Sequence, residues 1–288
     1  MAAVAWLRHH ALNIYAGLAI AYMLIPIAVI AVFSFGETPK DKLNFSLSGG
    51  FTLEYWQNAF SIEELNKAFR TSVELALLST LIATAIGTLM ALALVRHRFR
   101  GRHATNLLVI LPMATPEIVM GATLLSTFIF FEVVRGFTTL LIAHVMFSIS
   151  FVVVVVRSRL IGFDRSIEEA AQDLGATPLA TFRHVTLPLM APGVVAAALL
   201  AFALSLDDFV ISNFNSGVET QTFPLYVFGV ALRGIPVQVN VLATMLFAVT
   251  VIAILAVIWQ QRRAQRMASV AAEEEAAEAL AVASPAGA

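Results

Sequence analysis

The sequence contains no cysteine and few charged residues. Of its 288 residues, 13% are Asp, Glu, Lys or Arg and 59% are hydrophobic, whereas soluble domains are about 25% charged and about 45–50% apolar. The lack of cysteine excludes disulfides, thiolate metal sites and Cys nucleophiles. A net charge of −1 gives no electrostatic basis for binding nucleic acid. The composition predicts an all-α protein that crosses a membrane several times.

Motifs for enzymatic chemistry are also missing. The chain has no GxxxxGK[ST] phosphate loop, so it cannot hydrolyse ATP by that mechanism on its own. Its six histidines are scattered, and none has metal-ligand spacing with acids. His144 falls inside an apolar stretch and is predicted to be a hydrogen-bonded packing residue. We therefore expect no enzyme, no metal site and no cofactor in this chain.

Long apolar stretches predict six transmembrane helices, because about 20 apolar residues cross a bilayer. The first stretch is too long for a signal-peptide core. We expect a membrane domain over residues 1–263, followed at 264–288 by an Ala- and Glu-rich tail predicted to be disordered or a loose solvated helix. The predicted spans are 11–33, 72–95, 105–130, 137–156, 190–213 and 239–260.

Positive charge predicts the orientation of these spans. With the N-terminus inside, most of the 18 Lys and Arg residues fall in inner segments, above all in RHRFRGR at 96–102. Both termini are then cytoplasmic, in a cytoplasmic (inner) membrane. The outer loop 34–71 mixes aromatic and charged residues, which predicts short helices at the membrane surface.

The inner loop 157–188 is longer and more patterned than the others. The residues SIEE at 166–169 form an S-x-x-E capping box, which predicts a helix directly after the serine. Gly175 predicts the end of that helix. Thr-Pro at 177–178 predicts a second helix, which we expect to end at Pro188.

The same loop carries a family signature. Residues 169–188 read EAAQDLGATPLATFRHVTLP, which matches E-A-A, three residues, G, nine residues and I-x-L-P, with Val185 at the Ile position. The loop resembles the cytoplasmic signature loop of binding-protein-dependent ABC importer permeases. The stretches 111–125, 158–176 and 204–217 narrow the resemblance to the C-type permeases of spermidine/putrescine importers.

This resemblance implies a type I ABC importer permease fold with six transmembrane helices and a coupling helix that docks on an ATPase. It implies as partners a paralogous permease, two ATPase subunits that bind ATP and Mg, and a periplasmic or extracellular polyamine-binding protein. The residues it implicates in coupling are Glu168, Glu169, Ala170, Ala171, Asp173, Gly175 and Pro188.

Four acids lie within the predicted spans, and all but Glu74, which lies near the outer end of span two, are at a similar depth. An acid at the centre of a membrane helix costs about 2.5–3.5 kcal/mol, and such residues are functional by default. Asp207 and Asp208 lie roughly 21–22 Å into span five and Glu117 roughly 18 Å into span three, at 1.5 Å per residue. We predict that these acids, with Phe209, line a pathway for a polyamine.

Several alternatives stay open at this point. Neighbouring helix residues point about 100° apart, so one aspartate is expected to face the pathway while the other caps a backbone break or bonds a neighbouring helix. Each acid also has a structural alternative. The cargo of such a permease could instead be ferric iron or thiamine. A secondary transporter that binds a cation at Asp207, Asp208 or Glu117 is less favoured, because the patterned loop has no use there and no internal repeat is visible.

Overall fold

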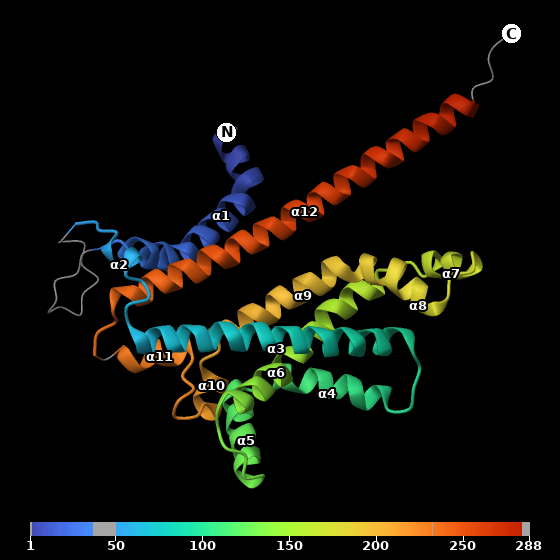
Figure 1. The fold of residues 1–288 in the computed structure, drawn as a ribbon. Helices are drawn as coiled ribbons and strands as arrows, with labels where there is room; N and C mark the ends of the chain where they lie inside the picture. Colours follow the sequence, from blue (N-terminus) through green and yellow to red (C-terminus); the bar gives the residue numbers. More distant parts are fainter. Residues whose placement is uncertain (1, 37–49, 232, 284–288) are drawn as a thin grey trace. The chain divides into compact units, whose positions relative to one another are not determined.

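The computed structural model describes residues 2–36, 50–231 and 233–283, with side chains from residue 11 onward except at 261, 264–265 and 268–283. Its described part is helical and contains no strand (Figure 1). Residues 1–244 and 245–288 form two units, which are described separately. The helices are α1 (Ala2–Phe33), α2 (Glu54–Gln57), α3 (Glu63–Arg96), α4 (Arg102–Ala114), α5 (Glu117–Phe130), α6 (Phe137–Ile161), α7 (Ser166–Asp173), α8 (Pro178–Thr181), η1 (Phe182–Thr186), α9 (Leu187–Asp207), α10 (Val210–Asn215), α11 (Phe223–Val230) and α12 (Val237–Ala283).

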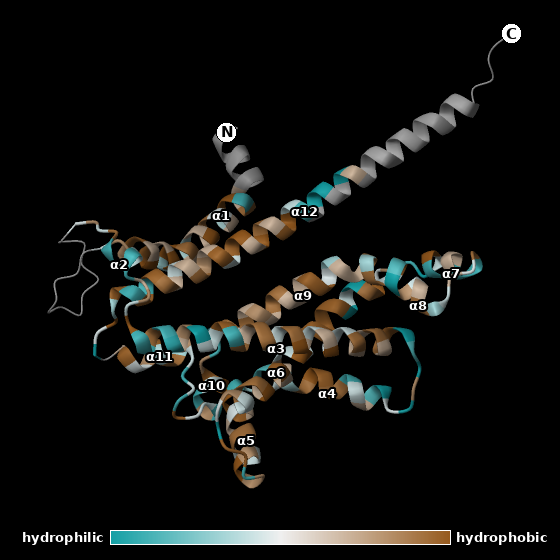
Figure 2. Ribbon diagram, in the orientation of Figure 1, coloured by the Kyte–Doolittle hydropathy of each residue, from teal (hydrophilic) through white to brown (hydrophobic). Residues whose placement is uncertain are grey.

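Most of the predicted spans are present. Within the described residues, five helices are long and apolar enough to cross a membrane, or up to six if the bent pair α4 and α5 is one span. The predicted spans at 11–33, 72–95, 137–156 and 239–260 lie within α1, α3, α6 and α12, which confirms them. Hydrophobic residues run along these helices, whereas the loop between α3 and α4 is hydrophilic (Figure 2).

Two predicted spans are broken, and one of these breaks lies at the aspartates, where a backbone break was one of the expected alternatives. Span three divides into α4 and α5, whose axes differ by 111°. Pro116 lies at this break and holds Thr115 extended, with ψ 131°. Span five divides at Asp208, which is also extended, with ψ 117°. Both breaks free backbone groups that must find partners within the protein.

Three long helices form the centre of the first unit. α3, α6 and α9 pack on one another, and the close approach of α3 and α6 depends on Gly87. A Cβ added there would lie 2.6 Å from Cγ1 of Val152, so a larger residue would push the two helices apart. The buried residues of this core are Ala83, Ala91, Leu94, Val109, Val152, Val153, Val156, Leu160, Met190, Ala197 and Ala201.

The outer segments differ in part from the surface helices that we expected. α2 is a short helix whose Trp56 stacks on Phe35 with ring centroids 5.0 Å apart. The second expected helix is instead the beginning of α3. The sequence analysis also missed α11, which is attached to α3 by a hydrogen bond from the Phe223 amide to Ser72 Oγ of 2.8 Å. Pro224 in its first turn was the available signal.

The second unit consists of the rest of α12, from Met245 onward. The helix continues to Ala283, so most of the Ala- and Glu-rich segment from 264 on is helical. Residues 284–288 lie outside the described residues.

Candidate functional sites: the coupling loop and the acidic layer

The coupling loop, residues 157–188, contains α7, α8 and η1. α7 begins at Ser166, one residue earlier than the capping box predicts, and no side chain caps it. Instead the Ser166 amide donates to the carboxylate of Asp164 at 2.9 Å, which lowers the pKa of that carboxyl below its usual value. The capping-box prediction is wrong because the Asp164 side chain, and not that of Ser166, accepts a hydrogen bond from the backbone at the start of α7.

The predicted end of α7 is confirmed. Gly175 has φ +90°, a conformation that favours glycine. Its amide donates to the carbonyl of Gln172 at 2.9 Å, and the Ala176 amide donates to the carbonyl of Ala171 at 3.0 Å. These two bonds form a Schellman motif, which satisfies the last carbonyls of the helix.

The second helix begins as predicted but does not end at Pro188. The Thr177 hydroxyl accepts a hydrogen bond from the Ala180 amide at 3.3 Å, with Pro178 in the first turn. The chain then passes through the π-turn η1 directly into α9. Leu187 donates to the carbonyl of Phe182, and this wider turn gives the Pro188 ring room against the preceding backbone. The coupling loop is therefore continuous with a membrane helix.

Glu168 fastens α7 to two other elements. Its carboxylate pairs with Arg96 at the end of α3, with one N–O distance of 2.8 Å, and accepts from the Thr186 hydroxyl at 2.5 Å. Both charged side chains are only 13% exposed. Glu168 therefore joins α3, α7 and η1 inside this chain, rather than presenting its charge to a partner.

The other predicted coupling residues lie mostly at the surface. Glu169, Ala170, Asp173, Gly175 and Pro188 are exposed, and Ala171 is half-buried. Large apolar side chains join them: Leu174 is 90% exposed, Leu179 76% and Ile167 46%. The sequence analysis missed these three, although apolar residues in a charged loop were visible. An apolar surface with acids around it suits a protein partner.

The acidic layer consists of Glu117, Asp207 and Asp208, each at a break in a span. Asp208 is the capping residue. Its carboxylate accepts from the amides of Ile211 at 3.1 Å and Ser212 at 2.7 Å, at the beginning of α10. This answers the question that the sequence left open, since the backbone break is capped by the second aspartate.

Asp208 also belongs to a buried polar network around His144, which is 2% exposed. The His144 ring contacts Asp208 at 3.4 Å, Ser205 at 2.7 Å and Ser212 at 3.0 Å. The Ser79 hydroxyl donates to Ser205 at 3.0 Å. The prediction of a hydrogen-bonded His144 is thereby confirmed, and the network ties α3, α6, α9 and α10 together.

Asp207 and Glu117 have different surroundings. Both are exposed, and Asp207 interacts electrostatically with Asp208 and with Glu117, so the structure brings the three acids together. Glu117 begins α5, where a helix N-terminus favours a carboxylate. Within the described residues, the Asp207 carboxylate has no hydrogen bond to another residue. Within the same residues the Glu117 carboxylate has none either, so both acids are available to a ligand.

Phe209 lies beside the acidic layer and packs on Phe228 of α11, with ring centroids 4.7 Å apart. Phe228 is 67% exposed, so one aromatic ring of the pair stays open to a ligand. Among the described residues, no group of three His, Asp or Glu is arranged to hold a metal ion.

Solved structures share this fold. A bacterial ABC transporter involved in the import of the acidic polysaccharide alginate aligns with a TM-score of 0.62 at 17% identity, over 92% of this chain and 99% of that chain. An amino acid ABC transporter aligns with a TM-score of 0.56 at 17% identity, over 74% of this chain and all of that chain. The predicted type I ABC importer permease fold is confirmed.

Relatives of known function are closer in sequence. The spermidine/putrescine transport system permease protein PotC of Haemophilus influenzae is 40% identical over 80% of this chain and 88% of its own length. PotC of Escherichia coli K12 is 38% identical, over 82% and 88%. The putrescine transport system permease protein PotI of the same strain is 35% identical, over 80% and 83%. Residues 83–269 match the family described as binding-protein-dependent transport system inner membrane component. The chain belongs to this family, as a multi-pass inner-membrane transport subunit and not an enzyme.

Proposed function

We propose that this chain is a pore subunit of an ATP-driven importer for polyamines such as spermidine or putrescine. Support comes from its relatives, which are named as permeases for these compounds. The observation that carries the proposal is the acidic layer, with three carboxylates at the breaks of two spans.

The chemistry of the acidic layer suits a polyamine. Protonated amines separated by methylenes require acids spaced along an apolar path. Asp207 offers a carboxylate without a protein partner, and Glu117 offers a second exposed one. The exposed Phe228 ring next to Phe209 adds a surface for cation–π contact, worth about 0.5–2 kcal/mol in good geometry. Asp208 contributes by holding the break open and in place.

In this proposal the coupling loop transmits the movement driven by ATP hydrolysis in the partner subunit to the membrane helices. The coupling loop docks on an ATPase subunit through Leu174, Leu179 of α8 and the exposed acids Glu169 and Asp173 of α7. Because η1 continues directly into α9, movement of α7 reaches Asp207 at the far end of the same helix. The complete importer has a paralogous permease, two ATPase subunits that bind ATP and Mg, and a polyamine-binding protein outside the membrane.

Uptake by the reconstituted importer tests the proposal. Proteoliposomes with the ATPase and the binding protein are loaded with ATP, and labelled spermidine, putrescine, thiamine and ferric iron are offered in turn. We expect uptake of a polyamine, and a loss of about ten-fold or more for Asp207→Asn, which corresponds to about 1.4 kcal/mol. Glu132→Gln, an exposed acid outside the acidic layer, is the matched control. Uptake of thiamine or iron alone, or wild-type uptake by Asp207→Asn, would refute the proposal.

A further inference from the structure

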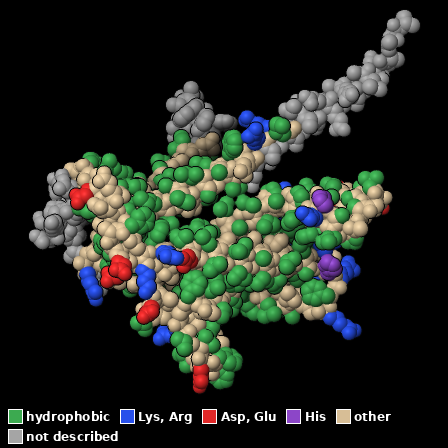
Figure 3. Space-filling view, viewed as in Figure 1, with side chains coloured by type: hydrophobic (Ala, Val, Ile, Leu, Met, Phe, Trp, Pro, Cys, Tyr) green, Lys and Arg blue, Asp and Glu red, His purple; other side chains and the backbone are tan. Residues whose placement is uncertain are grey.

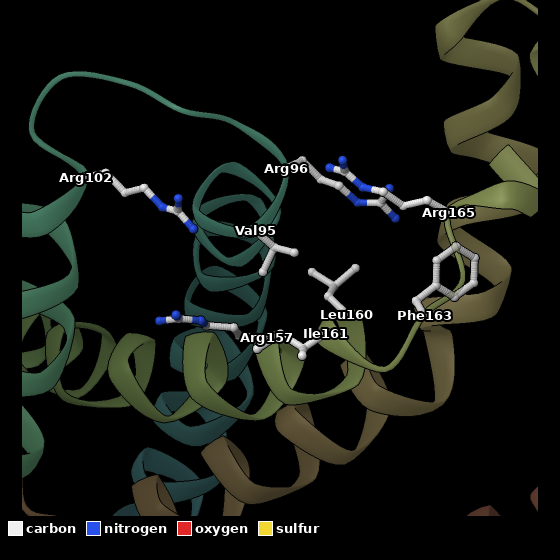
Figure 4. Close-up of a pocket in the computed structure, with 8 residues that line it drawn as sticks. All are labelled: Val95, Arg96, Arg102, Arg157, Leu160, Ile161, Phe163 and Arg165. Atoms are coloured by element: carbon white, nitrogen blue, oxygen red, sulfur yellow. The ribbon is translucent and has the colours of Figure 1, made fainter. Parts of the chain in front are cut away.

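The same end of the first unit that carries α7 contains an arginine-lined pocket. We define this arginine pocket by its lining residues: Val95, Arg96, Arg102, Arg157, Leu160, Ile161, Phe163 and Arg165. Its volume is about 320 Å³, and no acid is among its lining residues. Arg102 and Arg157 reach into it from one side, and Arg96 and Arg165 from the other (Figure 4). Four positive charges in one pocket are costly unless they are paired, so the pocket favours the binding of an anion.

The arginines are only partly neutralised by the protein itself. Arg96 pairs with Glu168 and lies 5.6 Å from the centre of the Phe163 ring. Arg157 donates to the side-chain oxygen of Asn106 at 3.0 Å, which leaves its charge in place. The Nε atom of Arg102 is buried and has no hydrogen-bond partner. A buried donor without a partner is costly, so an acceptor from outside the chain would stabilise the pocket.

We propose that the arginine pocket binds the phosphate group of an anionic phospholipid. The pocket lies between the ends of α3 and α6 and the beginning of α4, at the end that the positive-charge bias places in the cytoplasm. Basic pockets between membrane helices on that side bind acidic lipid headgroups. Arginine suits this role because its planar fork binds two phosphate oxygens at once.

The surroundings of the pocket favour a lipid over a free phosphate ion. The inner wall includes the apolar side chains of Val95 and Leu160. Ile161 lines the pocket and is 67% exposed, and further along α4 Leu107 is 64% and Leu108 65% exposed, which provides a surface for acyl chains. Figure 3 shows hydrophobic side chains over the middle of the helices, with Lys and Arg near this end. A soluble anion would make no use of this apolar border.

The bound lipid would also act on coupling. Arg96 lines the pocket and at the same time pairs with Glu168 of α7, so the lipid phosphate and the coupling helix share one guanidinium group. This link gives an anionic membrane a direct way to stabilise the position of α7. The inference does not depend on the nature of the cargo.

Lipid binding to the full-length chain, purified with its co-expressed subunits, tests this proposal. Native mass spectrometry measures the affinity for phosphatidylglycerol, for phosphatidylcholine with the same acyl chains, and for glycerol 3-phosphate. The pocket variant is Arg102→Gln/Arg165→Gln. The matched control is Arg98→Gln/Arg100→Gln, which removes the same charge from exposed positions of the adjacent loop.

We expect the pocket variant to bind phosphatidylglycerol about ten-fold more weakly than the wild type, because two charged donors are lost. The control should stay within about two-fold of the wild type, and phosphatidylcholine binding should be unchanged in both variants. If the double variant fails to assemble, Arg102→Gln is compared with Arg100→Gln.

Three results would overturn the proposal. The pocket and control variants lose phosphatidylglycerol equally, or neither loses it. Glycerol 3-phosphate binds as tightly as the lipid, which would make the pocket a site for a free anion. The complex with the ATPase subunits carries none of the lipid that the chain carries after these subunits are removed, which would make the pocket a protein interface.

Discussion

Adjacent acidic residues take different roles at two places in this chain. Glu168 pairs with Arg96 and Thr186, whereas Glu169 is exposed. Likewise one acid of the layer caps α10 while its neighbour has no such partner. Neighbouring side chains in α7 point about 100° apart, so Glu168 faces the protein while Glu169 faces outward. Asp207 ends α9, whereas Asp208 is extended and accepts hydrogen bonds from α10. In each pair, a substitution of one acid can therefore be compared with the same substitution of its neighbour.

Glu168→Gln should destabilise the coupling loop, because it leaves the Arg96 charge largely buried without its partner. We expect the free energy of unfolding to fall by about 2 kcal/mol, less than the 3–5 kcal/mol of a fully buried pair, since water still reaches both groups. Thermal unfolding of the purified protein measures this. Glu169→Gln should unfold at the wild-type temperature, and equal losses in both variants would contradict the role of Glu168.

Gly87→Ala should weaken the packing of α3 on α6. The new methyl group would lie 2.6 Å from Cγ1 of Val152, so a helix must shift. Overpacking of this kind costs about 1–3 kcal/mol. The control is Gly17→Ala, where a Cβ meets nothing within 4 Å. Only the Gly87→Ala variant should melt at a lower temperature than the wild type. A Gly87→Ala variant as stable as the wild type would show that α3 and α6 can move apart without a cost in stability.

At the scale of elements, local signals in the sequence were reliable except for the capping box at Ser166, and long-range signals were not reliable. The helix end at Gly175 and the helix start at Thr177 depend on bonds within a few residues, and both were predicted. The bend at Pro116 and the continuation through Pro188 were not predicted, and the break at Asp208 was only one of two alternatives. They depend on whether distant helices satisfy the freed backbone groups, which a single sequence does not display.

The candidate sites show the same limit. The sequence identified the acids of the layer and predicted that one aspartate would cap a break. It could not tell which one, because His144, the partner of Asp208, lies on another helix. Similarly, the ion pair of Glu168 with Arg96 was not predicted, because Arg96 is far away along the chain. Partners that are distant in sequence decide which acid remains free.

Gly175→Ala should disturb the end of α7 and therefore the coupling of ATP hydrolysis to transport. A residue with a Cβ at φ +90° is strained by about 1–2 kcal/mol, which favours opening of the Schellman motif. We expect cargo-stimulated ATP hydrolysis to fall in the reconstituted importer, while assembly persists. The control is Gly162→Ala at the other end of the loop, where φ is −81° and the nearest atom is 3.8 Å away. Equal activities of the two variants would argue against a coupling role for this turn.

At the scale of the whole molecule, the orientation in the membrane can be tested directly because the chain has no cysteine. Leu174 at the coupling loop is 90% exposed, and Val218 beyond the far end of α9 is fully exposed. The 21 residues of α9 separate these ends by roughly 30 Å at 1.5 Å per residue, about the thickness of the hydrocarbon core. Single cysteines at these two positions should therefore lie on opposite sides of the membrane.

In cells whose outer barrier is permeabilised and whose inner membrane is intact, a membrane-impermeant maleimide should label Val218→Cys. The same reagent should label Leu174→Cys only after the inner membrane is opened. The cysteine-free parent should stay unlabelled. Because α7 docks on an ATPase in the proposed importer, adding the ATPase subunits should protect Leu174→Cys and leave Val218→Cys reactive. Labelling of Leu174→Cys from outside would reverse the orientation that the Arg-rich loops predict. Labelling of Leu174→Cys at the same rate with and without the ATPase would instead place the docking surface elsewhere on the chain.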